Sequence, residues 1–291
     1  MTYENPPPKQ DVNVSHEHPL KEFAQLVIGL SVVVVIAVLV LGAAAGYLAK
    51  YIPIEYEQKM IDQIGLGSHN GTDFLNADSL SKEDQETQQR LQSLADKLTA
   101  HMNLPEGADI KVHYSASDTV NALATLGGNL VFFKGLLDTI ETEEELAAVM
   151  AHEIAHVQHR HPIVALGKGV TLATLAAVIG GASDSNAGQW LIGNTVNLSL
   201  LKFSRSQESQ SDATAAEALY KTYGNIQGAE KLFKHFSELE KNNAIDLSGG
   251  LEFLRSHPYS ENRWRDLEKL AQKNQWPTKG DLTPWKLETV N

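Results

Sequence analysis

The sequence predicts a mainly α-helical fold with one small β-sheet, an α+β domain, behind a single N-terminal transmembrane helix. Three observations predict it. A long uncharged apolar run lies near the N-terminus, two short central segments alternate apolar and polar residues, and most of the rest has helix caps or apolar residues three and four positions apart. With 291 residues and 42% hydrophobic content, the chain can form one domain with an ordinary core.

The first expected element is the apolar run. Residues 23–49 contain no charged side chain, and this run exceeds the roughly 20 residues that cross a bilayer. A cleavable signal peptide is the alternative, and the small residues Ala43 and Ala45 favour it, but its apolar region is usually only about 7–15 residues long and follows a basic leader. The leader here is acidic on balance. We therefore expect a disordered leader at residues 1–22 and a retained anchor at residues 23–49, in contact with the lipid bilayer.

Segments rich in small polar residues indicate the domain boundaries. Residues 62–80 are rich in Gly, Asn, Ser and Asp, which is typical of a flexible connection. We expect a tether over residues 50–80, a folded domain over residues 81–276 and an irregular C-terminal tail over residues 277–291.

Within the folded domain, apolar spacing predicts a helix, then strands, then more helices. The first helix has leucines at helical spacing and the first strand has alternating apolar residues: Leu91, Leu94 and Leu98, then Ile110, Val112 and Tyr114. A second strand or hairpin is expected over residues 121–133, with Gly127 and Gly128 at its turn. After Pro162 the chain is expected to be predominantly helical, ending near Asn274.

The apolar segment at residues 163–182 has two interpretations. Its composition suggests a second membrane span, or an amphipathic hairpin that covers a cleft or contacts the bilayer. Lys168 interrupts the segment, and several glycines weaken it as an independent helix. We expect a helix that is mostly buried in the domain core.

The segment His152-Glu153-Ile154-Ala155-His156 carries the strongest functional signal. It follows a capping-box pattern, with Thr142 as N-cap and Glu145 three residues later, so the motif is expected on a helix. Residues four apart share a helix face, which lets both imidazoles bind one metal ion. Glu153 then lies over the open coordination position, where a general base belongs. The spacing indicates a zinc hydrolase, and the alternative is a solvated, histidine-rich helix without metal.

A catalytic zinc site needs a third protein ligand and keeps one position for water. Glu208 is the candidate, in an alanine-rich helical stretch where Asp212 shares its face. Asp212 can accept the second N–H of a ligating histidine. By spacing alone, both carboxylates could instead face solvent. His159 and His161 flank the motif, but the site is complete without them, and we expect them to be exposed or satisfied by hydrogen bonds.

These residues together resemble a known family, the membrane-associated zinc metallopeptidases that include the CAAX prenyl endopeptidases, the bacterial heat-shock protease HtpX and related soluble envelope proteases. The resemblance covers roughly residues 85–275. Its matches, in the order of the family, are Asn121-Ala122 followed by Gly127-Gly128 and Gly135-Leu136-Leu137; the histidine motif; Arg205, Glu208 and Asp212; and Ser256-His257-Pro258 with Arg263.

The resemblance implies one Zn²⁺ per chain, held by His152, His156 and Glu208, in a mostly helical zincin-type metallopeptidase domain of the gluzincin kind. It implies peptide-bond hydrolysis with Glu153 as the base. It also places His257 near the metal as a candidate for stabilising the oxyanion.

Further expectations concern the surroundings of the site. Asp212 and Arg205 are expected to lie behind the metal ligands. The strand containing Asn121 and Ala122 is expected to hold the substrate main chain by edge pairing.

Composition and flanking charge bear on partners and location. A net charge of −12 offers no basic surface for nucleic acid, and the absence of cysteine excludes disulfides and thiolate zinc ligands. Lysines flank the apolar run equally, with Lys9 and Lys21 before it and Lys50 and Lys59 after it, so they do not decide its orientation. The resemblance favours a single-pass bacterial inner-membrane protein with a periplasmic catalytic domain.

Three functions remain open from the sequence. The first is an anchored zinc endopeptidase that cleaves polypeptide substrates, namely misfolded or damaged membrane and envelope proteins. The second is a zinc-dependent chaperone or scaffold that binds such proteins with little cleavage, and the third is a zinc hydrolase that is not a peptidase. The presence of Glu153 favours the first, because a non-cleaving relative is expected to have lost its general base.

Overall fold

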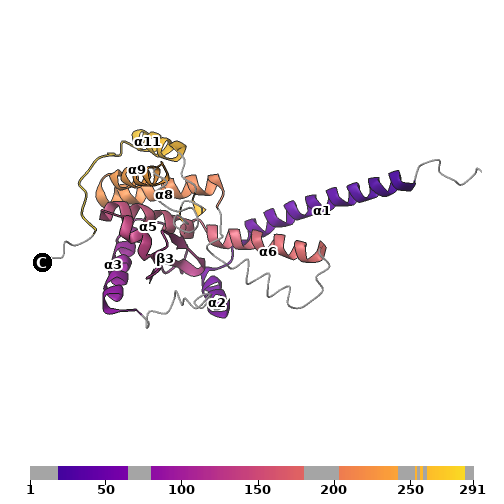
Figure 1. The fold of residues 1–291 in the computed structure, drawn as a ribbon, viewed down its shortest axis with the longest axis horizontal. Coiled ribbons are helices and arrows are strands. Elements are labelled where there is room, and N and C mark those ends of the chain that lie inside the picture. The colour runs from indigo at the N-terminus through magenta and orange to yellow at the C-terminus, as the bar shows by residue number, and fades with distance from the viewer. Residues whose placement is uncertain are drawn as a thin grey trace, which may run out of the picture.

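The computed structural model describes residues 19–64, 80–179, 203–241, 253, 256–257 and 261–285. They form a helical body around a three-stranded sheet, with one long helix projecting from it (Figure 1). This confirms the predicted α+β class. The helices are α1 (Pro19–Ala49), α2 (Ile54–Ile64), α3 (Lys82–Thr99), α4 (Lys134–Thr139), α5 (Glu143–Gln158), α6 (His161–Ile179), α8 (Arg205–Tyr223), α9 (Gln227–Lys241) and α11 (Glu261–Asn274).

Helix α1 is the predicted apolar element. In the described part of the chain it is the one helix that is long and apolar enough to cross a membrane. Most of its large side chains are exposed, from Leu20 to Leu48, and such a surface is compatible with lipid rather than with water. It begins at Pro19, earlier than expected, because proline is tolerated in the first turn of a helix.

Helix α2 lies where the first part of the tether was expected. Ile54, Glu57 and Ile61 share one face of this helix, and all three are buried. That face packs on the turn at residues 126–128, between two strands of the sheet. The expected tether is therefore wrong for these residues, because the small polar residues that suggested it begin only after the helix. Residues 65–79 lie outside the described part of the chain.

The sheet combines one parallel and one antiparallel pair. Strand β1 (Lys111–Ser115) runs parallel to β3 (Asn129–Phe133), and β2 (Ala122–Ala124) pairs antiparallel with β3, so β2 is an edge strand. A short 3₁₀ turn, η2 (Leu126–Gly128), joins β2 to β3. Gly127 and Gly128 have φ values of 68° and 83° there, a conformation that favours glycine.

Helix α5 occupies the centre of the helical body, packed against α3, α8, α9 and β2 (Figure 1). Its N-cap is Thr142, whose hydroxyl accepts a hydrogen bond from Glu145 N–H, as the sequence predicts. Helix α8 beside it starts with a capping box at Ser204 and ends at Gly224 in the left-handed conformation. These caps give both helices definite ends, so that their facing side chains are held in register.

Helix α6 packs along the C-terminal part of α1 rather than inside the main core, and the two lie side by side in Figure 1. Its first turns contribute Ile163 and Leu166 to a small cluster with Ala49 of α1. Gly167 faces Ala45 and Ala49 closely, so small residues let the two helices approach. The expectation of a core helix is therefore wrong for the described residues, because apolar composition does not specify which surface buries it.

The C-terminal residues 276–285 have an irregular backbone, and they pack as a strap across the domain. Pro277 O accepts a hydrogen bond from Ile226 N–H, and Trp285 N–H donates to Glu141 O. The Trp285 ring is buried under the Arg90 guanidinium, which lies 4.1 Å from the ring centroid. The folded unit thus continues through Trp285, beyond the boundary that the sequence predicts.

Candidate metal centre

The centre is built first on α5, whose third and fourth turns carry the two motif histidines. His152 and His156 lie four residues apart, and their Nε2 atoms are 3.0 Å from each other. Both rings are buried, at 5% and 0% exposure. The solvated-helix alternative is therefore wrong, because imidazoles on a solvated face would be exposed.

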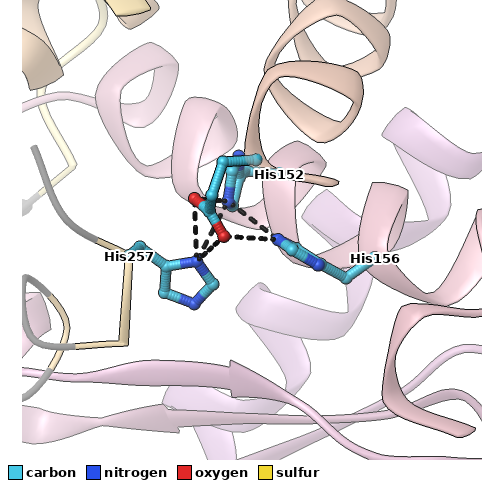
Figure 2. Close-up of side chains that lie close together, drawn as sticks. His152, His156 and His257 are labelled. Atoms are coloured by element: carbon cyan, nitrogen blue, oxygen red, sulfur yellow. Dashed lines mark hydrogen bonds and ion pairs between the residues drawn. The ribbon is translucent and has the colours of Figure 1, made fainter. Parts of the chain in front are cut away.

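Helix α8 contributes Glu208 to the same point, and the chain after α9 contributes His257. Glu208 Oε2 is 3.5 Å from His152 Nε2, and Glu208 Oε1 is 3.6 Å from His156 Nε2. His257 Nδ1 lies 3.0 Å from Glu208 Oε1 and 3.3 Å from His152 Nε2. Figure 2 shows the imidazoles of His152, His156 and His257 converging on one point. Sequence reasoning placed His257 near the metal but not among the donor atoms.

The spacing of these four donors fits a tetrahedral metal site. All four lie within 4.8 Å of one another. Zinc–nitrogen bonds of about 2.0–2.1 Å in a tetrahedron separate neighbouring ligand atoms by about 3.3 Å, and the contacts above lie close to this value. Three of the four donors would leave one position for water, whereas all four would fill it.

The charge of the pocket also fits a divalent cation. Glu153, Glu208 and Asp212 are buried carboxylates, and the Arg263 guanidinium pairs with Glu208 and Asp212. With neutral histidines, three carboxylates and one guanidinium leave two negative charges in a dry environment. Buried charge of this kind is costly unless it is paired or binds a metal. The group is therefore able to hold a metal ion.

The pKa values of the centre show how strongly these charges interact. Burial lowers the pKa of His152, but hydrogen bonds to Asp212 and Glu208 outweigh it and raise that pKa to about 10. Burial raises the pKa of Glu208, and hydrogen bonds to His152 and His257 outweigh it, so the net shift is downward. Burial and the neighbouring imidazoles push the pKa of His156 well below its usual value. In effect, a positive charge is favoured between His152 and the two carboxylates, which is where a cation would sit.

Asp212 lies directly behind His152, as the sequence predicts. Its Oδ1 is 3.0 Å from His152 Nδ1. Arg263 donates to both oxygens of Asp212, at 2.7 Å each, and its NH2 lies 3.1 Å from Glu208. Arg205 is exposed at the start of α8, and the arginine behind the ligands is Arg263. The prediction for Arg205 is therefore wrong, because the face of a helix cannot be assigned at its first residue from spacing alone.

Glu153 is fully buried beside the donor group. Its Oε2 accepts a hydrogen bond from Ala124 N–H at 2.7 Å. Its Oε1 has no hydrogen-bond partner in the described part of the chain and lies 3.4 Å from His257 Nε2. Burial raises the pKa of this carboxyl against the attraction of His257 and His152. One oxygen is thus fixed and the other is free to exchange a proton, which is what a general base requires.

The edge strand β2 presents alternate residues to this site. Asn121 O accepts from Phe133 N–H and therefore faces β3. Ala122 and Ala124 occupy the alternate positions, so their backbone groups face the free edge. Asn121 Oδ1 is buried and has no hydrogen-bond partner among the described residues. Sequence reasoning identified Asn121 and Ala122 but missed Ala124, which the period of two along a strand could have indicated.

Two helix-borne histidines, an adjacent carboxylate and a carboxylate from a second helix are the arrangement typical of a metallopeptidase. The chain belongs to peptidase family M48, whose sequence model matches residues 84–271. It is 25% identical over 194 residues to the beta-barrel assembly-enhancing protease of Yersinia pestis, covering 64% of this chain and 39% of that protein. It is 30% identical over 167 residues to the mitochondrial metalloendopeptidase OMA1 of Schizosaccharomyces pombe, covering 56% of this chain and 47% of that protein. The chain thus spans less than half the length of these relatives.

Proposed function

We propose that this protein is a zinc-dependent endopeptidase with His152, His156 and Glu208 as metal ligands and Glu153 as general base. The observation that carries the proposal is the buried donor group at tetrahedral spacing, next to a carboxylate with one fixed and one free oxygen. Membership of family M48 supports the same reaction class. The three ligands leave one coordination position for water.

The residues around the metal then have distinct tasks. When bound, Zn²⁺ would polarise the scissile carbonyl and acidify the attacking water. Glu153 would accept the proton of that water on Oε1 and transfer it to the leaving amine, while Ala124 N–H holds Oε2 in place. The free edge at Ala122 and Ala124 would pair with the substrate main chain and place the scissile bond beside the base. Because Ala124 N–H already donates a hydrogen bond to Glu153, we assign substrate pairing chiefly to the backbone of Ala122 and to the carbonyl of Ala124.

Removing the base without removing a ligand tests this assignment. Glu153→Gln should keep bound zinc and lose proteolysis, whereas His152→Ala, His156→Ala and Glu208→Ala should lose both. Metal analysis and mass spectrometry of casein digests, with and without chelator, measure the two properties. The control is Glu217→Gln, an exposed carboxylate of the same helix α8, which should change neither. Near-stoichiometric zinc in Glu208→Ala would remove that residue from the ligand set.

The same digests separate the alternatives. A chaperone or scaffold would bind unfolded protein and leave casein intact. A hydrolase that is not a peptidase would neither bind unfolded protein nor cleave casein. The free Oε1 of Glu153 is the observation that favours cleavage over binding alone.

His257 is proposed to stabilise charge that develops on the substrate oxygen. Its two ring nitrogens lie against Glu208 and Glu153, so the side chain must turn toward the substrate to donate there. If it acts in the transition state, His257→Ala should lower kcat by about 10²-fold or more with KM nearly unchanged. Full turnover with a lower melting temperature would show a structural role, and a large loss of zinc would show a metal ligand.

We further propose that α1 anchors the enzyme in the bacterial inner membrane with the catalytic domain in the periplasm. The exposed apolar surface of α1 supports an anchor. The relatives are named as a beta-barrel assembly-enhancing protease and a mitochondrial metalloendopeptidase, which is in keeping with misfolded envelope or membrane proteins as substrates. An alkaline phosphatase fusion at the C-terminus should be active, and an inactive fusion alongside an active cytoplasmic reporter would reverse the orientation.

A further inference from the structure

A second histidine group, His161 and His159, lies behind His156 and supplies none of the four donor atoms. His161 Nδ1 is 3.0 Å from His156 Nδ1, the nitrogen on the side away from the donor group. The His161 ring is 4% exposed, and it meets the His156 ring edge to face. The sequence leaves His161 as a flanking histidine that is exposed or satisfied by hydrogen bonds. It is buried and satisfied by hydrogen bonds, and one of them joins it to a candidate metal ligand.

The hydrogen bonds continue from His161 through three further side chains. His161 Nε2 lies 3.3 Å from Gln210 Oε1, and Gln210 Nε2 lies 3.1 Å from His159 Nδ1. His159 Nε2 then lies 2.8 Å from Thr214 Oγ1. Gln210 and Thr214 both belong to α8, the helix that carries Glu208. The chain of contacts therefore ties the end of α5 to the helix that supplies the third ligand.

The positions of the protons give this series of hydrogen bonds a single direction. An imidazole that binds a metal through Nε2 is neutral and carries its proton on Nδ1. His156 Nδ1–H then donates to His161 Nδ1, so His161 must carry its own proton on Nε2, where it meets Gln210 Oε1. The amide nitrogen of Gln210 donates in turn to His159 Nδ1. Every donor in the series faces an acceptor, and the orientation of the Gln210 amide agrees with it.

The two motif histidines are therefore supported in different ways. His152 has a carboxylate behind it, Asp212, which is itself held by Arg263. His156 has the neutral imidazole of His161 behind it. Among the described residues, His161 Nδ1 has one additional polar contact, to Ser211 Oγ at 3.4 Å. Ligating histidines almost always have such an outer partner, whose loss typically weakens metal binding.

The position of His161 depends on the turn between α5 and α6. Arg160 in that turn has a φ of 62°, in the left-handed region that non-glycine residues seldom adopt. Its guanidinium pairs with Glu57 of α2 at 2.6 Å and also donates to Ile52 O. These contacts hold the turn in a shape that directs the next side chain, His161, back under His156.

We propose that His161 is a positioning residue for the metal centre: it accepts the Nδ1 proton of His156 and fixes the tautomer and ring orientation in which His156 Nε2 binds the metal. The proposal rests on the ligand assignment under the proposed function. His161 contacts neither substrate nor metal, and it acts through His156.

Zinc affinity measured by chelator competition tests this directly and does not require activity. The full chain is used in detergent, in a Glu153→Gln background that prevents self-cleavage. His161→Leu removes the acceptor and should weaken zinc binding by about 10–100-fold. His161→Asn places an amide oxygen near the former Nδ1 and should restore most of the affinity. His101→Leu, an exposed histidine after α3, is the matched control and should leave zinc affinity unchanged.

The outcomes separate positioning from packing. Zinc affinity within about twofold of the parent in His161→Leu, at a melting temperature near that of the parent, would overturn the proposal, because loss of an outer partner typically costs tenfold or more. Equal losses of zinc in His161→Leu and His161→Asn, in step with falling melting temperatures, would also overturn it in favour of simple packing. His156→Ala should bind zinc far more weakly than either variant. If His156→Ala kept parental affinity, the ligand assignment itself would fail, and the test would report that separately from His161.

Discussion

The two ends of helix α5, which carries the histidine motif, are held by two different segments. One precedes the catalytic domain in the sequence, and the other lies at its C-terminal end. At the C-terminal end, next to the metal centre, α2 inserts Glu57 between Arg160 and the backbone of Gly127. At the N-terminal end, the strap forms a backbone hydrogen bond from Glu143 N–H to Thr283 O, and Thr283 donates to Glu144 from both its N–H and its hydroxyl. Helix α2 thus holds the C-terminal end of α5, and the strap at residues 276–285 holds its N-terminal end.

The two fastenings differ in kind. Glu57 and Arg160 form a buried ion pair, with exposed fractions of 3% and 9%. Loss of one partner from such a pair leaves an uncompensated charge in a dry site. The strap relies on several separate hydrogen bonds, and Thr283 itself is exposed, so water can replace what a substitution removes. The end near the metal therefore depends on one buried ion pair and its backbone contacts, and the far end distributes its attachment over separate hydrogen bonds.

The largest expected effect is at the metal end. Glu57→Ala should lower the free energy of unfolding by about 3–5 kcal/mol, because Arg160 remains buried without its partner. It should also weaken zinc binding, since Arg160 precedes His161. Denaturant unfolding in detergent and chelator competition measure the two effects. Glu55→Ala, an exposed position of the same helix, is the control. If Glu57→Ala unfolds like this control, α2 is a passive tether after all.

A smaller effect is expected at the strap. Thr283→Val removes the hydroxyl that donates to Glu144 but keeps the backbone hydrogen bonds, and it should cost about 1 kcal/mol of unfolding free energy. Zinc affinity should stay at the parental value, because this contact lies at the opposite end of α5 from the motif. The same unfolding and chelator measurements apply. Loss of zinc in Thr283→Val would show that the two ends of the helix are coupled and not independent.

The smallest effect concerns pH and also lies at the N-terminal end. His235 of α9 contacts the buried Glu145 carboxylate, with 2.6 Å between Nδ1 and Oε1, and this hydrogen bond raises the pKa of His235 despite partial burial. A histidine whose pKa is raised by folding contributes stability below its unfolded pKa and loses it as pH rises through the folded value. As the pH rises above the ordinary histidine pKa of about 6.5, the melting temperature should therefore fall more in the parent than in His235→Gln. Parallel curves for the two proteins would contradict the prediction.

Local signals explain how much of this protein was predictable. The spacing of His152 and His156, the cap at Thr142 and the uncharged run of α1 each depend on residues close together in the sequence, and periodicity reports them directly. Glu208 and Asp212 were also predictable as a pair, because four residues in a helix share a face. Thus the helical class, the small sheet, the motif helix and the candidate ligands follow from the chain itself.

Tertiary structure decided what those elements touch. The sequence does not show that α2 docks on the sheet turn, that α6 packs on α1, or that the strap reaches the start of α5, because each contact joins segments far apart in the chain. The same holds within the centre, where Arg263 rather than Arg205 supports Asp212 and where His161 lies under His156. Helical spacing predicts which residues share one face of a helix. Which segment packs against that face depends on how well the two surfaces fit together, and only the folded structure shows that pairing.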